Sequence, residues 1–150
     1  MKQGFTLVEL TIVVGILSII LLAISSPFVN ILQYQRNSQQ NDNVRDNIQF
    51  VLNVLDKELR TSSNPSSTGP GQLQVTNQDG ISVTYTLSGG VLQKNGVAIT
   101  DPTIFTLTNV QFTINTNGSP TVPVITVILT AIPINGGESI TMQGTTMPRN

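Results

Sequence analysis

Hydrophobic and polar residues follow three patterns along the chain, and the first is an uninterrupted apolar run. Residues 10–24 read LTIVVGILSIILLAI and contain no charged side chain. About 20 helical residues cross the hydrocarbon core of a bilayer, and a core helix of a soluble protein is normally apolar on one face only. This run is apolar on every face. We therefore expect a membrane anchor or a signal peptide removed after the run, and we disfavour a buried core helix.

The second pattern is a helical stripe that follows an interruption at Pro27. Proline removes a backbone donor and disfavours helix in the residue before it, so we expect a kink or local melting here. Beyond it, the apolar residues that recur with the 3.6-residue period of one helix face are Val44, Ile48, Val51, Leu52, Leu55 and Leu59. The stripe predicts an amphipathic helix with one face to bury.

The third pattern is an alternation of apolar and polar residues, which is typical of strands. It follows the sequence SSNPSSTGPG at residues 62–71, which predicts a loop that ends the helix. Alternation and turn residues predict strands at residues 81–87, 105–107, 110–114, 124–132 and 139–143, and a hairpin of residues 91–94 and 97–100 around Asn95-Gly96. We expect these strands to form one antiparallel sheet.

These patterns together predict an α+β fold. A sheet with one polar face has to cover its other face, and residues 44–59 form the only amphipathic helix that the sequence offers for this purpose. The expected architecture is a long N-terminal α-helix, with a transmembrane half and an amphipathic half, packed on a C-terminal antiparallel β-sheet domain.

Composition and charge exclude several classes of function. The chain has 150 residues, a formal net charge of −1, and neither cysteine nor histidine. More than half of its charged residues lie within residues 36–60, and no basic cluster is available to bind the phosphates of a nucleic acid. Without cysteine or histidine there is no thiol nucleophile, no imidazole base, no disulfide and no usual zinc ligand. We predict no nucleic-acid partner.

No group of residues suggests catalysis, a cofactor or a metal. Asp79, Asp101 and Glu138 are isolated from one another, and the first two stand beside a glycine and a proline, as turn residues do. The paired glycines lack the lysine of a phosphate-binding loop. Calcium requires six to eight oxygen ligands, and no segment after the loop clusters carboxylates. We expect neither an enzyme nor a metal or cofactor site.

The first ten residues carry a more specific motif. Residues 4–10, GFTLVEL, directly precede the apolar run and resemble the class III signal of type IV prepilins and type II secretion pseudopilins. The resemblance implies the pilin fold, cleavage between Gly4 and Phe5 by a membrane-embedded prepilin peptidase, and methylation of the new amine of Phe5. Glycine before the cut suits a narrow protease cleft, because any side chain there would clash. Residues 1–4 would be the leader.

Glu9 is the one charged residue beside the apolar run. A charge at the centre of a bilayer costs about 2.5–3.5 kcal/mol on insertion scales, and such carboxylates usually have a partner. The expected partner is the amine of Phe5 on a neighbouring subunit, in a filament whose apolar helices bundle. The alternatives are that Glu9 reaches the membrane interface or pairs with the amine of its own chain.

Gly15 and Pro27 bracket a segment of the predicted helix. The resemblance implies that this segment loses helical hydrogen bonding when the subunit leaves the membrane for the filament. The alternatives are close helix packing for Gly15 and a simple kink for Pro27.

The resemblance also implies partners, location and domain boundaries. The partners would be other pilin subunits, the prepilin peptidase and the inner-membrane assembly platform. Lys2 predicts a single-pass precursor with a cytoplasmic N-terminus and an exported C-terminal domain, later part of an extracellular pilus or a periplasmic pseudopilus. The expected segments are the leader at 1–4, the apolar helix at 5–26, the amphipathic helix at 27–61, the linker at 62–71 and the β-domain at 72–150.

Weaker similarities bear on the role of the subunit. Residues 50–60, FVLNVLDKELR, resemble part of the long helix in PilW-type minor pilins and GspJ-like pseudopilins, and residues 83–85 and 147–150 are also similar to segments of that group. They favour a minor pilin that acts at the tip or in initiation. The alternatives are the major pilin of the filament and a signal-anchored exported β-domain with an adhesive role.

Overall fold

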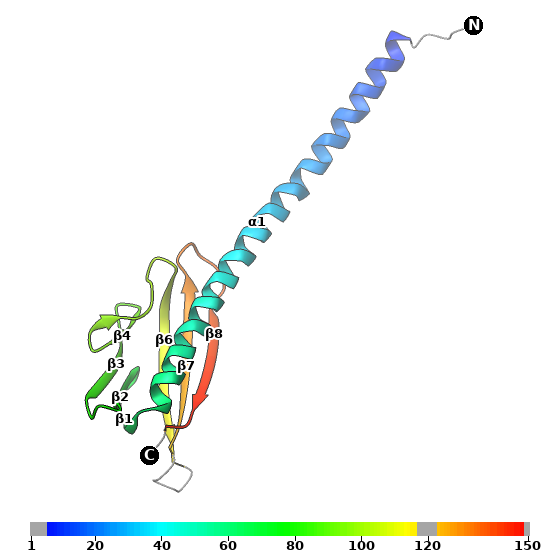
Figure 1. The fold of residues 1–150 in the computed structure, drawn as a ribbon. Helices are drawn as coiled ribbons and strands as arrows, with labels where there is room; N and C mark the ends of the chain where they lie inside the picture. The colour runs from blue at the N-terminus through cyan, green and yellow to red at the C-terminus, as the bar shows by residue number, and fades with distance from the viewer. Residues whose placement is uncertain (1–5, 117–122, 149–150) are drawn as a thin grey trace. The chain divides into compact units, whose positions relative to one another are not determined.

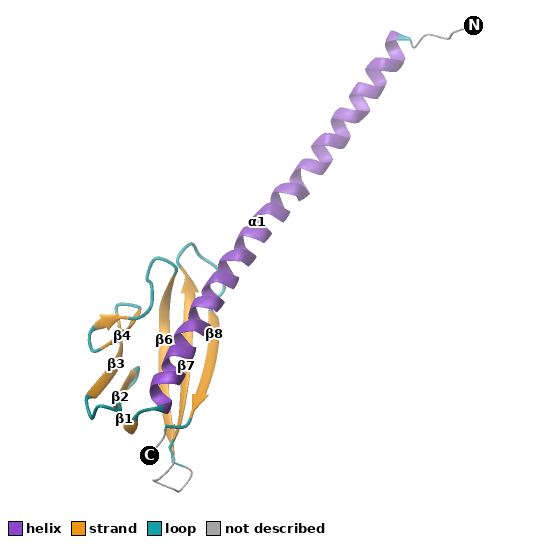
Figure 2. Ribbon diagram, in the orientation of Figure 1, coloured by secondary structure: helices purple, strands orange, loops and turns teal. Residues whose placement is uncertain are grey.

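The computed structural model describes residues 6–116 and 123–148, which form one helix and eight strands (Figure 1). The elements are α1 (Leu7–Arg60), β1 (Ser63–Gly69), β2 (Gln72–Thr76), β3 (Ser82–Ser88), β4 (Val91–Lys94), β5 (Val97–Ala98), β6 (Phe105–Asn115), β7 (Val124–Pro133) and β8 (Ile140–Thr146). The fold is α+β, as the sequence predicts, with a long N-terminal helix followed by antiparallel strands (Figure 2).

The chain divides into two compact units, Met1–Gln39 and Gln40–Asn150. The helix continues through Pro27, although proline has no N–H and cannot donate a hydrogen bond to the carbonyl of Ala23, four residues earlier. The local melting expected at Pro27 from the sequence is therefore not found in the single chain, where the residues on both sides of the proline are helical. The loss of helical hydrogen bonding between Gly15 and Pro27 in the assembled filament stays a prediction.

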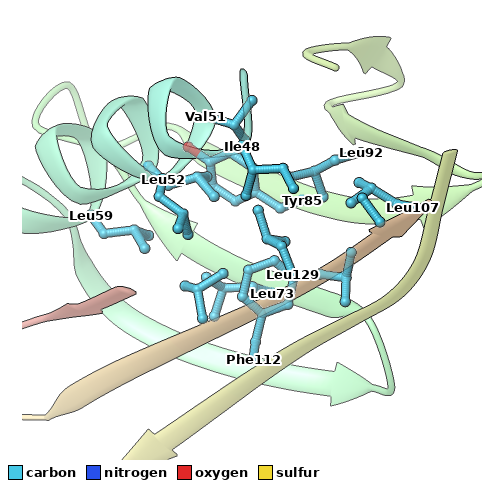
Figure 3. Close-up of a cluster of buried hydrophobic side chains, with 14 of the residues drawn as sticks. Ile48, Val51, Leu52, Leu59, Leu73, Tyr85, Leu92, Leu107, Phe112 and Leu129 are labelled. Carbon is cyan, nitrogen blue, oxygen red and sulfur yellow. The ribbon is translucent and has the colours of Figure 1, made fainter. Parts of the chain in front are cut away.

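Within the second unit, the helix packs through the apolar stripe that its sequence predicts. All six residues of the stripe are buried, with exposed fractions of 5% or less: Val44, Ile48, Val51, Leu52, Leu55 and Leu59. In Figure 3, Ile48, Leu52 and Leu59 lie among side chains from the strands. Burial of a Leu, Ile or Val side chain contributes about 1.5–3 kcal/mol, so this stripe is a main source of stability for the unit.

The strands form two sheets, whereas the sequence analysis expected one. The first sheet has the order β1-β2-β3-β4-β5 and the second has the order β6-β7-β8, and all pairings are antiparallel. The division falls at the turn after β5. There the backbone N–H of Thr103 donates to Asp101 Oδ1 (2.8 Å) and the N–H of Ile104 donates to the Asp101 carbonyl (3.3 Å). This turn separates the two sheets along the chain.

Both sheets turn apolar residues toward one shared core. The five-stranded sheet contributes Leu73, Val75, Val83, Tyr85 and Leu92, and the three-stranded sheet contributes Phe105, Leu107, Val110, Phe112, Ile125, Val127, Leu129, Ala131 and Ile140. Figure 3 shows Leu73 of one sheet beside Leu129 and Phe112 of the other. The alternating burial of β7 matches the two-residue period from which that strand was predicted.

The predicted loop at residues 62–71 is wrong for most of its length, because Ser63–Gly69 forms β1. This strand pairs with β2 through an irregular register, with shifts between Ser63 and Ser66 and between Ser66 and Gly69. An edge strand tolerates proline and irregular pairing, which explains how Pro65 fits into it. The strands expected at 105–107 and 110–114 are likewise one strand, β6, with a register shift after Leu107.

Candidate functional site

The N-terminal end of α1 is fixed by Thr6, which precedes the first helical residue. The backbone N–H of Glu9 donates to Thr6 Oγ1 (3.3 Å), and the N–H of Leu10 donates to the Thr6 carbonyl (3.2 Å). Thr6 is thus the N-cap, and Glu9 stands at the third helical position, the spacing of a capping box. A carboxylate in the first turn also interacts favourably with the helix dipole.

The two hydroxyl groups within residues 10–24 are satisfied inside the helix. Thr11 Oγ1 donates to the carbonyl of Val8 (2.8 Å), and Ser18 Oγ donates to the carbonyl of Val14 (2.8 Å). Such bonds allow a polar side chain to lie in an apolar environment. The carboxylate of Glu9 has no such partner among the residues that the structure describes, and it is exposed. It is the group in this segment that needs a partner from outside the described chain.

The apolar side chains of the first unit are exposed throughout. α1 is the one helix in the described residues that is long and apolar enough to cross a membrane. None of the residues in its most apolar stretch is buried. Exposed fractions between 42% and 79% are found at Leu7, Val8, Leu10, Ile12, Val13, Val14, Ile16, Leu17, Ile19, Ile20, Leu21, Leu22, Ile24, Phe28, Val29, Ile31 and Leu32. So large an apolar surface requires lipid or other apolar helices around it.

The remaining predicted site residues fall into two groups. Gly15 is in the helix, and no atom would lie within 4 Å of a Cβ built there, so packing inside the single chain does not require glycine at this position. Pro27 is also inside the helix, with an exposed side chain. Gly4 and Phe5, the expected cleavage site, lie outside the described residues.

A second cluster of polar groups joins the C-terminal end of α1 to the five-stranded sheet. Glu58 accepts hydrogen bonds from Lys94 Nζ (2.6 Å) and from the hydroxyl of Tyr85. Burial raises the pKa of Glu58, but the two donors together lower it by more, so the pKa lies below its ordinary value. Burial and the neighbouring carboxylate both raise the pKa of Tyr85.

This cluster borders a hollow of about 430 Å³. The Glu58 carboxylate is already paired with the Lys94 ammonium. The hydroxyls of Thr61 and Ser62, which also line the hollow, donate to backbone carbonyls. Within the described residues, no group of three potential ligands is close enough to hold a metal ion. The arrangement therefore fixes the helix end on the sheet and offers no catalytic pair.

Sequence reasoning missed the capping role of Thr6 and the bonds of Glu58. The first was readable, because threonine followed three residues later by glutamate before an apolar run is the signature of a capping box. The second was not, because the partners Tyr85 and Lys94 lie far from Glu58 in the sequence.

Comparison with known proteins identifies the N-terminal segment. Residues 1–25 match the family model described as the prokaryotic N-terminal methylation motif. Neither the curated proteins nor the solved structures include a match to this chain. The motif supports a type IV pilin-like or pseudopilin structural subunit rather than an enzyme, and it suggests assembly with other pilins and membrane machinery. Together with the apolar helix, it fits a membrane-anchored precursor.

Proposed function

We infer that the chain is a subunit of a type IV pilus or a pseudopilus-like filament, held in the filament by the apolar half of α1. The observation that carries this proposal is the carboxylate of Glu9. Among the residues that the structure describes, it has no partner, and it stands in the first turn of a helix whose large apolar side chains are exposed from Leu7 to Leu32. A methylation motif covers the same residues.

The proposed processing creates a new amine that can pair with Glu9. A prepilin peptidase cuts between Gly4 and Phe5 and methylates the new amine of Phe5. The amine of one subunit then lies close to the start of its helix, where it can meet the Glu9 carboxylate of a neighbour. Because Thr6 caps the helix just before Glu9, the carboxylate is held in the first turn rather than on a frayed end.

Two energies act together in this assembly. A charge pair at about 4 Å and an effective dielectric constant near 20 is worth on the order of 4 kcal/mol before desolvation is subtracted. The net affinity of the pair is therefore small. Packing of the exposed apolar side chains supplies most of the energy, and the charge pair sets the register of each incoming subunit.

The proposal extends to role and location. The resemblance of residues 50–60 to PilW-type and GspJ-like proteins favours a minor subunit at the tip or in initiation. The precursor spans the cytoplasmic membrane once, and the folded unit is exported. A deletion that leaves fewer filaments of normal composition supports the minor role, whereas loss of the dominant filament protein identifies the major subunit.

Mass spectrometry of the mature protein tests the processing step. The expected chain begins at a methylated Phe5. A chain cleaved after the apolar run, near Ser25, or one that keeps Met1 contradicts the proposal and favours an ordinary exported β-domain.

Substitution of Glu9 tests the pairing. Glu9→Val keeps the helix apolar, so it should leave membrane insertion intact and reduce filament assembly. Thr11→Val is the matched control, because the hydroxyl of Thr11 bonds only within its own helix and its removal should leave assembly unchanged. Normal assembly by Glu9→Val rules out the proposed pairing.

A further inference from the structure

Strand β8 is an edge strand whose outer side is unpaired. It pairs with β7 on one side, and in the part of the chain that the structure describes no strand pairs with its other side. No turn or loop of that part forms a backbone hydrogen bond with it either. An open edge presents N–H and C=O groups in the spacing of another strand. The chemistry of this edge therefore specifies a β-strand as its occupant.

This edge also lacks the features that usually keep strand edges apart. Charged side chains, prolines and bulges protect most edges from pairing. β8 reads ITMQGTT, without a charge or a proline, and it pairs with β7 without a register shift. The other two strands of the sheet, β6 and β7, contain no charged residue either.

The sequence of β8 is complementary to itself. In an antiparallel pair of two β8 strands centred on Gln143, all seven residues of each strand have a partner. The half-buried Met142 then faces Gly144 of the second copy, which has no side chain, and Thr141 faces Thr145. A large residue opposite a glycine, and a hydroxyl opposite a hydroxyl, are favourable cross-strand pairs.

We propose that the β8 edge is a docking site for a second copy of this chain, paired antiparallel with Gln143 opposite Gln143. The contact of two seven-residue strands is smaller than a standard interface of about 1,600 Å². It is therefore weak, and because the pairing is two-fold it closes at two copies and does not continue along a filament.

Cysteine cross-linking of the full-length chain in detergent tests the pairing, and the natural sequence helps because it contains no cysteine. Residues directly opposite in an antiparallel pair have Cα atoms about 4.5–5.5 Å apart, within reach of a disulfide. Gln143→Cys should form disulfide-linked dimers at least about tenfold faster than Thr113→Cys, an exposed position on β6 that serves as the control.

The register provides a second test. Thr141→Cys and Thr145→Cys should each cross-link slowly alone and rapidly when mixed, because each faces the other across the proposed pair. In the Gln143→Cys chain, lysine at both 141 and 145 places like charges opposite each other and should slow dimer formation to the control rate. Lysine at 141 with glutamate at 145 should restore it.

Three results would overturn the proposal. They are equal rates for Gln143→Cys and the control, a fast self-reaction of Thr141→Cys, and no effect of the two lysines. None of these readouts depends on cleavage at Phe5 or on Glu9, so this proposal and the filament proposal fail independently.

Discussion

Removal of the Glu58 side chain should destabilise the folded unit more than an ordinary surface substitution. Glu58 accepts one hydrogen bond from the hydroxyl of Tyr85, a residue that is only 1% exposed, and another from the ammonium of Lys94. In Glu58→Ala, the hydroxyl loses its acceptor and Lys94 loses its counter-ion. The hydroxyl is the more costly loss, because a polar group is then left in a largely buried residue.

The size of the effect follows from these two interactions. A hydrogen bond to a charged group contributes about 1.5–3 kcal/mol. The ion pair adds about 0.2–1 kcal/mol, because both side chains are about one third exposed and water screens them. Water in the adjoining hollow partly replaces the lost acceptor, so we expect a net loss of about 2 kcal/mol. For a unit of residues 40–150 this corresponds to a decrease in Tm of about 8 °C.

Calorimetry of the full-length chain in detergent measures this change, and a second substitution identifies its cause. Tyr85→Phe removes the hydroxyl itself, so Glu58→Ala/Tyr85→Phe should be more stable than Glu58→Ala by about 1 kcal/mol. Lys94→Met should cost less than about 1 kcal/mol, because it removes only the screened pair. The reasoning is refuted by a Tm for Glu58→Ala within about 2 °C of the parent, or by a double variant no more stable than Glu58→Ala.

Further substitutions test the core and a turn of the folded unit, and a pH titration tests Glu58 in another way. Ile48→Ala should destabilise it by about 2–5 kcal/mol in the same calorimetric assay, because Ile48 is fully buried, while Phe50→Ala on the exposed face should cost less than about 0.5 kcal/mol. Gly90→Ala should lower the Tm, because φ is +77° and the new Cβ would lie 2.4 Å from Thr106 Cγ2; a Tm equal to that of the parent contradicts this contact. The pKa of Glu58 is lower when folded than its ordinary value of 4.5, so the unfolded chain binds the extra proton first and stability should fall as the pH decreases through and below that value. Glu58→Gln should remove this part of the decrease in stability at low pH. A variant whose stability changes with pH as the parent's does would contradict the lowered pKa of Glu58.

The sequence predicted those parts of the fold that depend on local periodicity. The stripe from Val44 to Leu59 repeats with one period over four turns, so a single pattern identifies both the helix and its buried face. The hairpin around Asn95-Gly96 was equally predictable, because asparagine and glycine are the residues that most readily adopt the positive φ that a tight hairpin turn requires. Both residues have positive φ in the turn between β4 and β5.

The division into two sheets was not readable, because it depends on pairings between distant segments. Nothing local distinguishes a strand of one sheet from a strand of the other, and the separation at Asp101 is recognisable only once the partners of β5 and β6 are known. β1 was missed for another reason. Its serines, threonine and proline are typical of a loop, and it is a strand because β2 offers it an edge.

The two halves of α1 impose opposite demands on their surroundings, and this difference carries the functional argument. From Val44 to Leu59, the folded unit of the same chain covers the apolar stripe of the helix, so this stripe needs no second chain to bury it. From Leu7 to Leu32, the described chain leaves the large apolar side chains exposed. The hydroxyls of Thr11 and Ser18 bond within the helix, whereas the Glu9 carboxylate has no partner among the described residues. In the proposed filament, a neighbouring subunit supplies both an apolar surface and an N-terminal amine, and the Glu9→Val substitution distinguishes this pairing from membrane anchoring alone.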